Sequence, residues 1–347
     1  MKKPDRERLR WSQIGLIALC VFLALVLLGM IFATAYVDHF LAQIHYIPMD
    51  TTLSPEAIAS IEQNLTETVP PDYTGAVINP TDIPNPPGNF PTLIQHPDIV
   101  NFLLVGQDRR PGQGRQRSDS MIVITFNKRN RTITLTSFLR DMYVDIPGFR
   151  ATKMNAAYER GGFSMLCDTL LQNFGVVIDG CIEVDFDGFA SVVDLVGGVD
   201  IDLTAAEAKH LNEGYGWTLT KGVNHLDGEK ALAYSRVRAI GNDYARTQRQ
   251  RTVLTKIIEG CKNLSFFELS TLLNNTLPLI STTMTSNEIS NYLLDLFPML
   301  SGSNVRALRI PADGTFTEAM ISSGVGDSLV PDLEKNRQLL IQTLLPK

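Results

Sequence analysis

The stretch SMIVITFNKRNRTITLTSF, residues 120–138, predicts two neighbouring strands of a buried sheet. Its two halves are rich in β-branched residues, and the polar run from Asn127 to Asn130 between them is typical of a hairpin turn. A third stretch, IVNFLLVG at 99–106, is mostly apolar and ends at a glycine. We expect it to form another buried strand, paired antiparallel with residues 120–126.

Helical patterns follow these strands along the chain. We expect helices within 161–175, 185–198, 226–238 and 243–260, then a strand at 304–311 and a proline-started amphipathic helix from 331 to the end. Asp227 and Asp243 are the predicted N-caps of the third and fourth helices, and Gly260 is the predicted end of the fourth. Because strands and helices are interleaved, the predicted fold class is α/β, a layered α-β-α sandwich with a mixed central sheet.

One N-terminal transmembrane helix is predicted ahead of this fold. Residues 14–37 contain no charge, and 24 residues are enough for a helix to cross a hydrocarbon core of about 30 Å. The flank, residues 1–13, carries five basic and two acidic residues, so the positive-inside rule places the N-terminus in the cytoplasm and the rest of the chain outside the cell membrane. A cleaved signal peptide is the alternative, although its apolar region is usually only about 7–15 residues long.

An extracytoplasmic stalk is expected between this span and the folded part. Residues 69–98 hold eight of the 18 prolines, a composition that favours an extended linker. Ser54-Pro55-Glu56 indicates the start of a short helix that reaches about Leu65. The predicted organisation is therefore a flank at 1–13, a span at 14–37, a stalk at 38–98 and one domain at 99–347.

Charge excludes nucleic acid as a partner. Removing the five basic and two acidic residues of the flank from totals of 31 and 37 leaves a net charge of −9 beyond the flank. Binding to phosphate backbones requires basic surface instead. The motifs of serine hydrolases, zinc peptidases and nucleotide-binding loops are absent from the sequence. Four scattered cysteines, at 20, 167, 181 and 261, form no C-x-x-C pair, and whether Cys167, Cys181 or Cys261 pair in a disulfide is left open.

Two carboxylates flank the first predicted strand pair. Asp108 follows the strand that ends at 106 and Asp119 precedes the strand that begins at 120, so antiparallel pairing would bring both to one end of the sheet. Two carboxylates in such a place can share Mg²⁺, whose remaining ligands are water and phosphate oxygens. The alternative is that each aspartate only forms a turn.

Basic residues gather in the segments that follow. A helix beginning at Asp243 would place Arg246, Arg249 and Gln250 on one face, above apolar residues, so that these side chains turn inward. Five arginines within 236–251 need more partners than one aspartate, and a diphosphate at the helix N-terminus would supply them. A solvated charged face is the alternative. The predicted diphosphate-binding residues are Arg140, Lys153, Arg236, Arg238, Arg246, Arg249 and Gln250.

Seven motifs occur in order between about residues 99 and 262: GQDRR, RSDSMIVI, SFLRDMYVDIPG, KMNAAYERGG, GGVDIDL, HLDGEKALAYSRVR and DYARTQRQR. They resemble the LytR-CpsA-Psr family of cell-envelope proteins, and residues 304–347 resemble its closing strand and helix. The resemblance implies transfer of a glycopolymer phosphate from a polyprenyl diphosphate carrier to peptidoglycan, outside the membrane. It also implies Mg²⁺ binding by Asp108 and Asp119. The diphosphate-binding residues that it implies are Arg140, Arg236, Arg238, Arg246 and Gln250, and the expected catalytic set is Asp108, Asp119, Arg140, Arg236 and Arg238.

The segment DFDGFASVVDLVGG, 185–198, is the expected lining for the prenyl tail, since its apolar residues exceed what one helix surface needs, although burial in an ordinary core is the alternative. We expect an apolar cavity beside the arginines and the two aspartates. Two other functions share the same predicted site: a diphosphatase, in which water replaces the sugar hydroxyl, and a non-catalytic protein that binds lipid-linked glycopolymer.

Overall fold

The computed structural model describes residues 45–49, 70, 73–83, 94–107, 118, 120–322 and 324–346, all within the unit His45–Lys347. The flank at 1–13, the apolar segment at 14–37 and the short helix expected at 54–65 lie outside these residues. A search of the helices that are described finds none long and apolar enough to cross a membrane.

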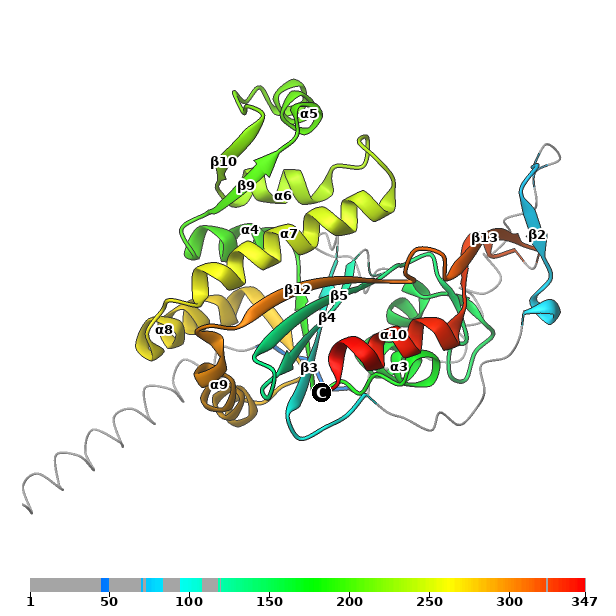
Figure 1. Cartoon of the computed structure of the whole chain (residues 1–347), viewed down its shortest axis with the longest axis horizontal. Coiled ribbons are helices and arrows are strands. Elements are labelled where there is room, and N and C mark those ends of the chain that lie inside the picture. Colours follow the sequence, from blue (N-terminus) through cyan, green and yellow to red (C-terminus); the bar gives the residue numbers. More distant parts are fainter. Residues whose placement is uncertain are drawn as a thin grey trace, which may run out of the picture. The chain divides into compact units, whose positions relative to one another are not determined.

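Within this part of the chain a central sheet has seven strands in the order β1-β11-β8-β3-β4-β5-β12 (Figure 1). Three of the four strands predicted from the sequence stand together, β3 antiparallel to β4 and β4 antiparallel to β5. β8 joins β3 and β12 joins β5 in parallel, so the sheet is mixed, as predicted. The strand bounds are β1 His45–Tyr46, β3 Ile99–Gly106, β4 Ser120–Asn127, β5 Thr132–Phe138, β8 Gly180–Val184, β11 Ile280–Thr282 and β12 Asn304–Ile310.

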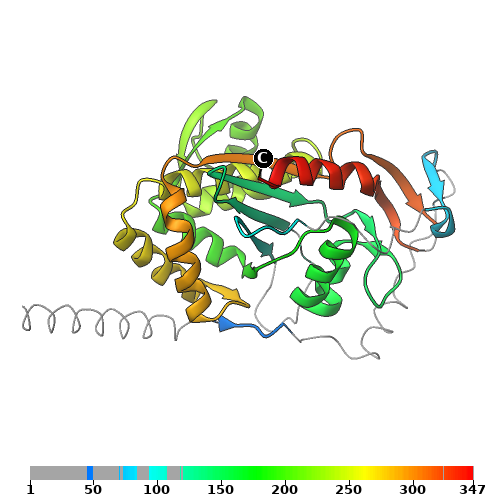
Figure 2. The same ribbon diagram turned by 60° about the horizontal axis from the view of Figure 1, so that its bottom comes forward.

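Helices cover both faces of this sheet (Figures 1 and 2). Successive side chains of a strand point to opposite faces. In β3, Leu103 packs in the core under helices α3 and α10, whereas Phe102 packs in the core that includes helix α9. The arrangement is therefore α/β in three layers. The helix bounds are α3 Asn155–Phe174, α4 Phe186–Leu195, α5 Ala205–Tyr215, α6 Gly228–Arg236, α7 Asp243–Cys261, α8 Phe266–Thr276, α9 Ser286–Leu300 and α10 Leu333–Leu344, with 3₁₀ turns at Pro80–Asp82 and Leu277–Leu279.

Three small sheets accompany the central one in the described ranges, and none of them is among the elements predicted from the sequence. Two of them, β13 with β14 and β2, and β6 with β7, stand beside the loop that follows β5. Their bounds, with those of the third sheet, are β2 Ala76–Ile78, β6 Tyr143–Val144, β7 Thr152–Lys153, β9 Val199–Leu203, β10 Gly222–Leu226, β13 Phe316–Ile321 and β14 Gly326–Pro331.

Several predicted helix ends were wrong by a few residues. α3 begins at Asn155 rather than 161, because a short helical segment before Gly161 joins the predicted helix across non-helical backbone at Gly161 and Gly162. The N-cap of α7 is Asn242, whose side chain accepts from the Ala245 N–H, and this frees the Asp243 carboxylate for other contacts. Gly260 lies inside α7, which ends at 261. The last helix starts at 333 rather than 331, because Pro331 is the final residue of strand β14.

The fold brings two of the cysteines together. The Sγ atoms of Cys167 in α3 and Cys181 in β8 lie 3.4 Å apart, with Cys181 fully buried. We expect the chain refolded in a glutathione buffer to form this disulfide, two thiols giving up two protons and two electrons to one glutathione disulfide. A disulfide between these cysteines, which are 14 residues apart in the sequence, should stabilise the fold by about 3 kcal/mol. Mass spectrometry after denaturing alkylation should find two thiols protected.

Cys261 provides the control for this prediction. It lies on α7 and is not part of the pair. A Cys261→Ser variant should still protect two thiols, and Cys167→Ser should protect none. A wild-type chain that remains fully alkylated after oxidative refolding would contradict the prediction.

Candidate functional site

A cavity of about 510 Å³ opens at one end of the central sheet, between the sheet and helices α4, α6 and α7. Its lining divides into arginines and a glutamine on one hand and apolar side chains on the other. This is the combination expected for a ligand with a charged head and an apolar tail. The lining residues are Leu104, Gly106, Ser120, Ile122, Arg140, Val184, Phe186, Phe189, Leu232, Ser235, Arg236, Arg238, Arg246, Gln250 and Leu254.

The floor of the cavity is made by the ends of paired strands. Gly106 at the end of β3 is the register partner of Ser120 at the start of β4, and Leu104 is the partner of Ile122. Directly opposed residues point to the same face, so these positions form one surface. A Cβ on Gly106 would lie 3.2 Å from the Ser120 Cβ, so glycine keeps this floor open.

Two arginines of the cavity share one carboxylate. Arg246 is 3% exposed, and its Nε donates to Asp243 Oδ1 at 2.8 Å, with Nη2 at 2.7 Å. Arg140, which follows β5, places Nη2 3.7 Å from the same oxygen and Nε 3.3 Å from Asp141 Oδ2. Asp243 thus fixes two guanidinium groups from distant parts of the chain. Asp243 was predicted as a helix cap and as one partner of the arginine cluster, and its i, i+3 spacing to Arg246 is the local signal for this contact.

Gln250 stands one turn further along α7. Its Oε1 accepts a hydrogen bond from the Ser120 hydroxyl at 3.1 Å, which joins α7 to the floor of the cavity. An amide whose oxygen is engaged in this way keeps its NH₂ group as a donor. Ser120 was not among the predicted site residues.

Arg236 and Arg238 come from the end of α6, where the helix ends and Val237 is its C-cap. Both side chains are exposed. The Arg236 guanidinium carbon lies 4.1 Å from the centre of the Phe186 ring, a cation–π contact. This contact places a charged group of α6 directly on an apolar wall residue of α4. Phe186 and Phe189, predicted tail-lining residues, both line the cavity, whereas Val193 of the same segment is buried in a core cluster.

Two predicted diphosphate ligands lie outside the lining. Arg249 is 5% exposed, and its Nε donates to Glu207 Oε1 at 2.7 Å while its terminal nitrogens donate to the carbonyls of Val237 and Ile240. Lys153 places Nζ 3.8 Å from Asp141 Oδ1. We therefore leave both out of the site: Arg249 fastens α7 to α5 and to the loop after α6.

The Glu207–Arg249 pair also has an electrostatic signature. Burial raises the pKa of the Glu207 carboxyl, but hydrogen bonds from Arg249 and Thr204 outweigh burial and lower it overall. The charged form is thus favoured in the fold. The same carboxylate completes a capping box with Thr204 at the start of α5.

Asp108 and Asp119 lie outside the residues that the structure describes. The described strand ends nearest to them in the sequence, Gly106 and Ser120, are register partners. Among the described side chains there is no group of three His, Cys, Asp or Glu residues that could hold a metal ion. The described lining of the cavity carries no carboxylate.

A close backbone approach sets the spacing between the wall helix α4 and the arginine helix α6. A Cβ on Gly228 would overlap the Ala190 carbonyl oxygen, so α6 would have to move away from α4. We expect Gly228→Ala to lower the free energy of unfolding by about 1–3 kcal/mol and to weaken ligand binding at the cavity. Denaturant unfolding measures the first effect.

Gly214, within α5, is the matched control because a Cβ there meets nothing within 4 Å. Gly214→Ala should leave stability unchanged or raise it by up to about 1 kcal/mol. Equal stability of the two variants would show that α4 and α6 do not depend on this contact.

A model of the LytR_cpsA_psr family matches residues 72–337. The polyisoprenyl-teichoic acid–peptidoglycan teichoic acid transferase TagU of Bacillus mycoides (strain KBAB4) is 34% identical over 249 residues, which are 70% of this chain and 77% of TagU. The crystal structure of B. subtilis TagV has a TM-score of 0.58 at 28% identity, covering 73% of this chain and 100% of TagV. A structure of TagT bound to LIIa-WTA has a TM-score of 0.58 at 26% identity, covering 72% of this chain and 91% of TagT. The chain therefore belongs to the LytR-CpsA-Psr family.

Proposed function

We propose that this protein transfers a phosphate-linked glycopolymer from a polyprenyl diphosphate carrier to peptidoglycan during cell-wall assembly. The observation that carries the proposal is the cavity of about 510 Å³, which combines four arginines with an apolar wall that includes Phe186 and Phe189. A water-soluble diphosphate would need the arginines but not the apolar wall. A carrier with a prenyl tail uses both.

The arginines suit a diphosphate in different ways. Arg246 and Arg140 are held in place by Asp243 before any ligand binds, so little side-chain freedom is lost on binding. Arg236 and Arg238 are exposed at the end of α6 and can direct planar guanidinium forks at phosphate oxygens. Together the four groups compensate the charge of a diphosphate.

The relatives support the same reaction class. TagU is named for transfer of teichoic acid from a polyisoprenyl carrier to peptidoglycan, and TagT has been solved with LIIa-WTA bound. In the proposed reaction, a peptidoglycan sugar hydroxyl attacks the phosphorus that bears the glycopolymer. The new O–P bond forms, the bond to the bridging oxygen breaks, polyprenyl phosphate leaves, and the hydroxyl proton is released. The arginines stabilise the negative charge that develops on the leaving group.

We further propose Mg²⁺ as the cofactor, bound through Asp108 and Asp119. The support is the register of Gly106 with Ser120, because each aspartate lies within two residues of one of these paired strand ends. When bound, Mg²⁺ would compensate phosphate charge during transfer. We expect Asp108→Asn or Asp119→Asn to abolish metal-dependent turnover without loss of folding, because Asn keeps the turn but loses the charged ligand. Full activity of both variants would reduce the two aspartates to turn residues.

The proposed location is the outer face of the cell membrane, with the chain anchored by one helix at 14–37 and its N-terminus in the cytoplasm. The support is the uncharged apolar run and its basic flank. A reporter that is active only outside the membrane, fused after Val100, should be active. An inactive fusion would reject this topology.

The test of the reaction uses a purified carrier-linked donor with and without peptidoglycan. A transferase should join the polymer covalently to peptidoglycan and release polyprenyl phosphate, and both events should require the acceptor. Release of polyprenyl phosphate at the same rate without peptidoglycan would identify a diphosphatase. Binding of the donor with no turnover under either condition would identify a lipid-linked polymer binding protein.

A further inference from the structure

A second hollow, which the proposed donor site does not use, lies beside the loop that follows β5. It has a volume of about 1330 Å³ and stands between this loop, the β13–β14 hairpin, the start of α10 and the 3₁₀ turn near residue 80. Small-molecule pockets usually measure about 300–1,000 Å³, so this hollow is large enough for a segment of polymer. We call it the acidic groove, after four carboxylates in its lining: Asp82, Asp145, Asp332 and Glu334.

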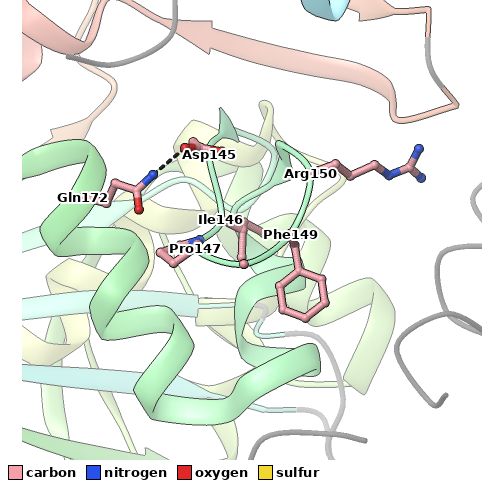
Figure 3. Close-up of a pocket in the computed structure, with 7 residues that line it drawn as sticks. Asp145, Ile146, Pro147, Phe149, Arg150 and Gln172 are labelled. Atoms are coloured by element: carbon pink, nitrogen blue, oxygen red, sulfur yellow. Dashed lines mark hydrogen bonds between the residues drawn. The ribbon is translucent and has the colours of Figure 1, made fainter. Parts of the chain in front are cut away.

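One wall of the acidic groove is the loop at residues 143–151. Figure 3 shows this loop, with Asp145 bonded to Gln172 of α3, and with Phe149 and Arg150 projecting from it in different directions. A neighbouring hollow of about 570 Å³ lies against the same loop and shares Asp145, Phe149 and Arg150 with the groove. The loop therefore presents an aromatic ring, a carboxylate and a guanidinium to ligands on this side.

This loop leads directly to the donor site. Tyr143, in the groove, is the register partner of Lys153. Lys153 lies 3.8 Å from Asp141, whose other carboxylate oxygen is 3.3 Å from Arg140 of the cavity. The wall of the groove is thus linked to Arg140 of the cavity through Lys153 and Asp141.

The opposite wall of the groove, formed by β13, contacts helix α7 of the donor site. Phe316, at the start of β13, lines the groove and packs edge to face against Tyr244, with ring centres 5.9 Å apart. Tyr244 is the second residue of α7, next to Asp243, which holds Arg246 and Arg140. This wall is therefore linked to Arg246 and Arg140 through Tyr244 and Asp243.

Charge separates the two hollows. The described lining of the cavity includes four arginines and no carboxylate, whereas that of the groove includes four carboxylates against Arg150 and Lys335. A diphosphate is attracted to the first and repelled by the second. The groove is thus unsuited to the anionic end of the donor. The sugar rings of a peptidoglycan strand are uncharged, and the amines of its peptides are cations with which these carboxylates can pair. Phe149 and Phe316 offer ring faces on which sugars can stack.

We propose that the acidic groove binds the acceptor, a peptidoglycan strand, and delivers its sugar hydroxyl to the phosphorus held at Arg140. This rests on the proposed transferase function. The occupant is a polymer of neutral rings with amine-bearing peptides, which the net negative groove accepts. The same negative charge keeps the anionic donor out of the groove. The two substrates then occupy separate hollows, so neither has to leave before the other binds.

The test reverses charge in the groove. The variant Asp82→Lys/Glu334→Lys changes two exposed groove residues, and Glu213→Lys/Asp295→Lys makes the same change on exposed residues of α5 and α9. The probe is a soluble disaccharide-peptide oligomer of peptidoglycan, measured by calorimetry without donor and by the KM for transfer. Groove reversal should weaken oligomer affinity and raise its KM by about tenfold, equivalent to about 1.4 kcal/mol, with the Kd of the lipid-linked donor unchanged.

The possible outcomes distinguish failure of the groove assignment from failure of the proposed transferase function. Unchanged oligomer affinity and KM in the groove variant, or equal losses in the α5/α9 variant, would overturn the acceptor assignment. A weaker or stronger donor Kd in the groove variant, with the oligomer unaffected, would mean that the donor polymer occupies the groove. If the wild type binds the oligomer in a groove-dependent manner but never transfers polymer to it, the groove assignment stands and the proposed transferase function fails.

Discussion

Replacing Arg249 with methionine should lower the free energy of unfolding by about 3–5 kcal/mol at neutral pH, because it leaves the Glu207 carboxylate buried without its cation. Glu207 is 7% exposed, and Arg249 supplies it with a hydrogen bond of 2.7 Å. The carbonyls of Val237 and Ile240 also lose their donors. Chemical denaturation at pH 7 measures the difference.

The pH dependence follows from the lowered pKa of Glu207. A carboxyl whose pKa is depressed by folding contributes stability above its unfolded value, near 4.5, and that stability is lost as the pH falls through the folded value. In the Arg249→Met variant, burial would raise this pKa unopposed by arginine. The wild type and the variant should therefore differ most at neutral pH, and the difference should shrink as the medium is acidified. Glu207→Gln added to Arg249→Met should recover part of the loss, because the amide oxygen still caps α5 without a buried charge.

Arg251 provides a matched control on the same helix. It is 4% exposed, and its Nη2 donates to Gln248, whereas Nε and Nη1 have no hydrogen-bond partner among the described residues. Burial and the neighbouring Arg309 lower its pKa to about 10. Because its loss would strand no described carboxylate, Arg251→Met should be neutral or stabilising. A large loss from Arg251→Met, or none from Arg249→Met, would contradict this account of the two arginines.

The sequence predicted the centre of the sheet because strong local signals coincide there. β3, β4 and β5 are β-branched or apolar runs with a polar turn, and their pairing is local. The β13–β2 pairing joins Ala319 to Ala76 across most of the chain, and no local pattern encodes such a register. α5, α8 and α9 were not predicted, although the sequence contains a local signal for each of them. Each begins with a capping box, such as Ser265 with Glu268 at α8.

The site shows the same division between local and distant information. Helical spacing correctly turned Arg246 and Gln250 inward, since residues four apart differ by only about 40° around the helix axis. Arg249 differs from Arg246 by about 60° in the opposite sense, which is enough to direct it to Glu207 of α5 instead of the cavity. The position of α5 depends on tertiary packing, so the separate roles of the two arginines could not be read from spacing. The cap assigned to Asp243 is provided instead by Asn242, one residue earlier, through a local contact with the Ala245 N–H.

Replacing Arg236 with lysine should reduce binding of the carrier-linked donor by about 1–3 kcal/mol, roughly a 5- to 150-fold increase in Kd. The substitution keeps the positive charge but removes the planar guanidinium, which lies 4.1 Å from the Phe186 ring and can present two parallel N–H groups to a phosphate. Arg238→Lys should show a loss of the same kind, since it removes the other fork at the end of α6. Titration with a donor in detergent measures the Kd.

Arg306→Lys is the control, because Arg306 is an exposed arginine on β12 outside the cavity lining. Near-wild-type affinity is expected there. If Arg236→Lys and Arg306→Lys bind the donor equally well, the arginines at the end of α6 act only as surface charge. A further comparison separates stacking from the fork: Phe186→Leu keeps the apolar wall but removes the ring face, so it should weaken donor binding only to the extent that the cation–π contact positions Arg236, by about 0.5–1 kcal/mol. A loss from Phe186→Leu that equals the loss from Arg236→Lys would mean that the aromatic wall, by holding the guanidinium over the cavity, accounts for the whole advantage of arginine at this position.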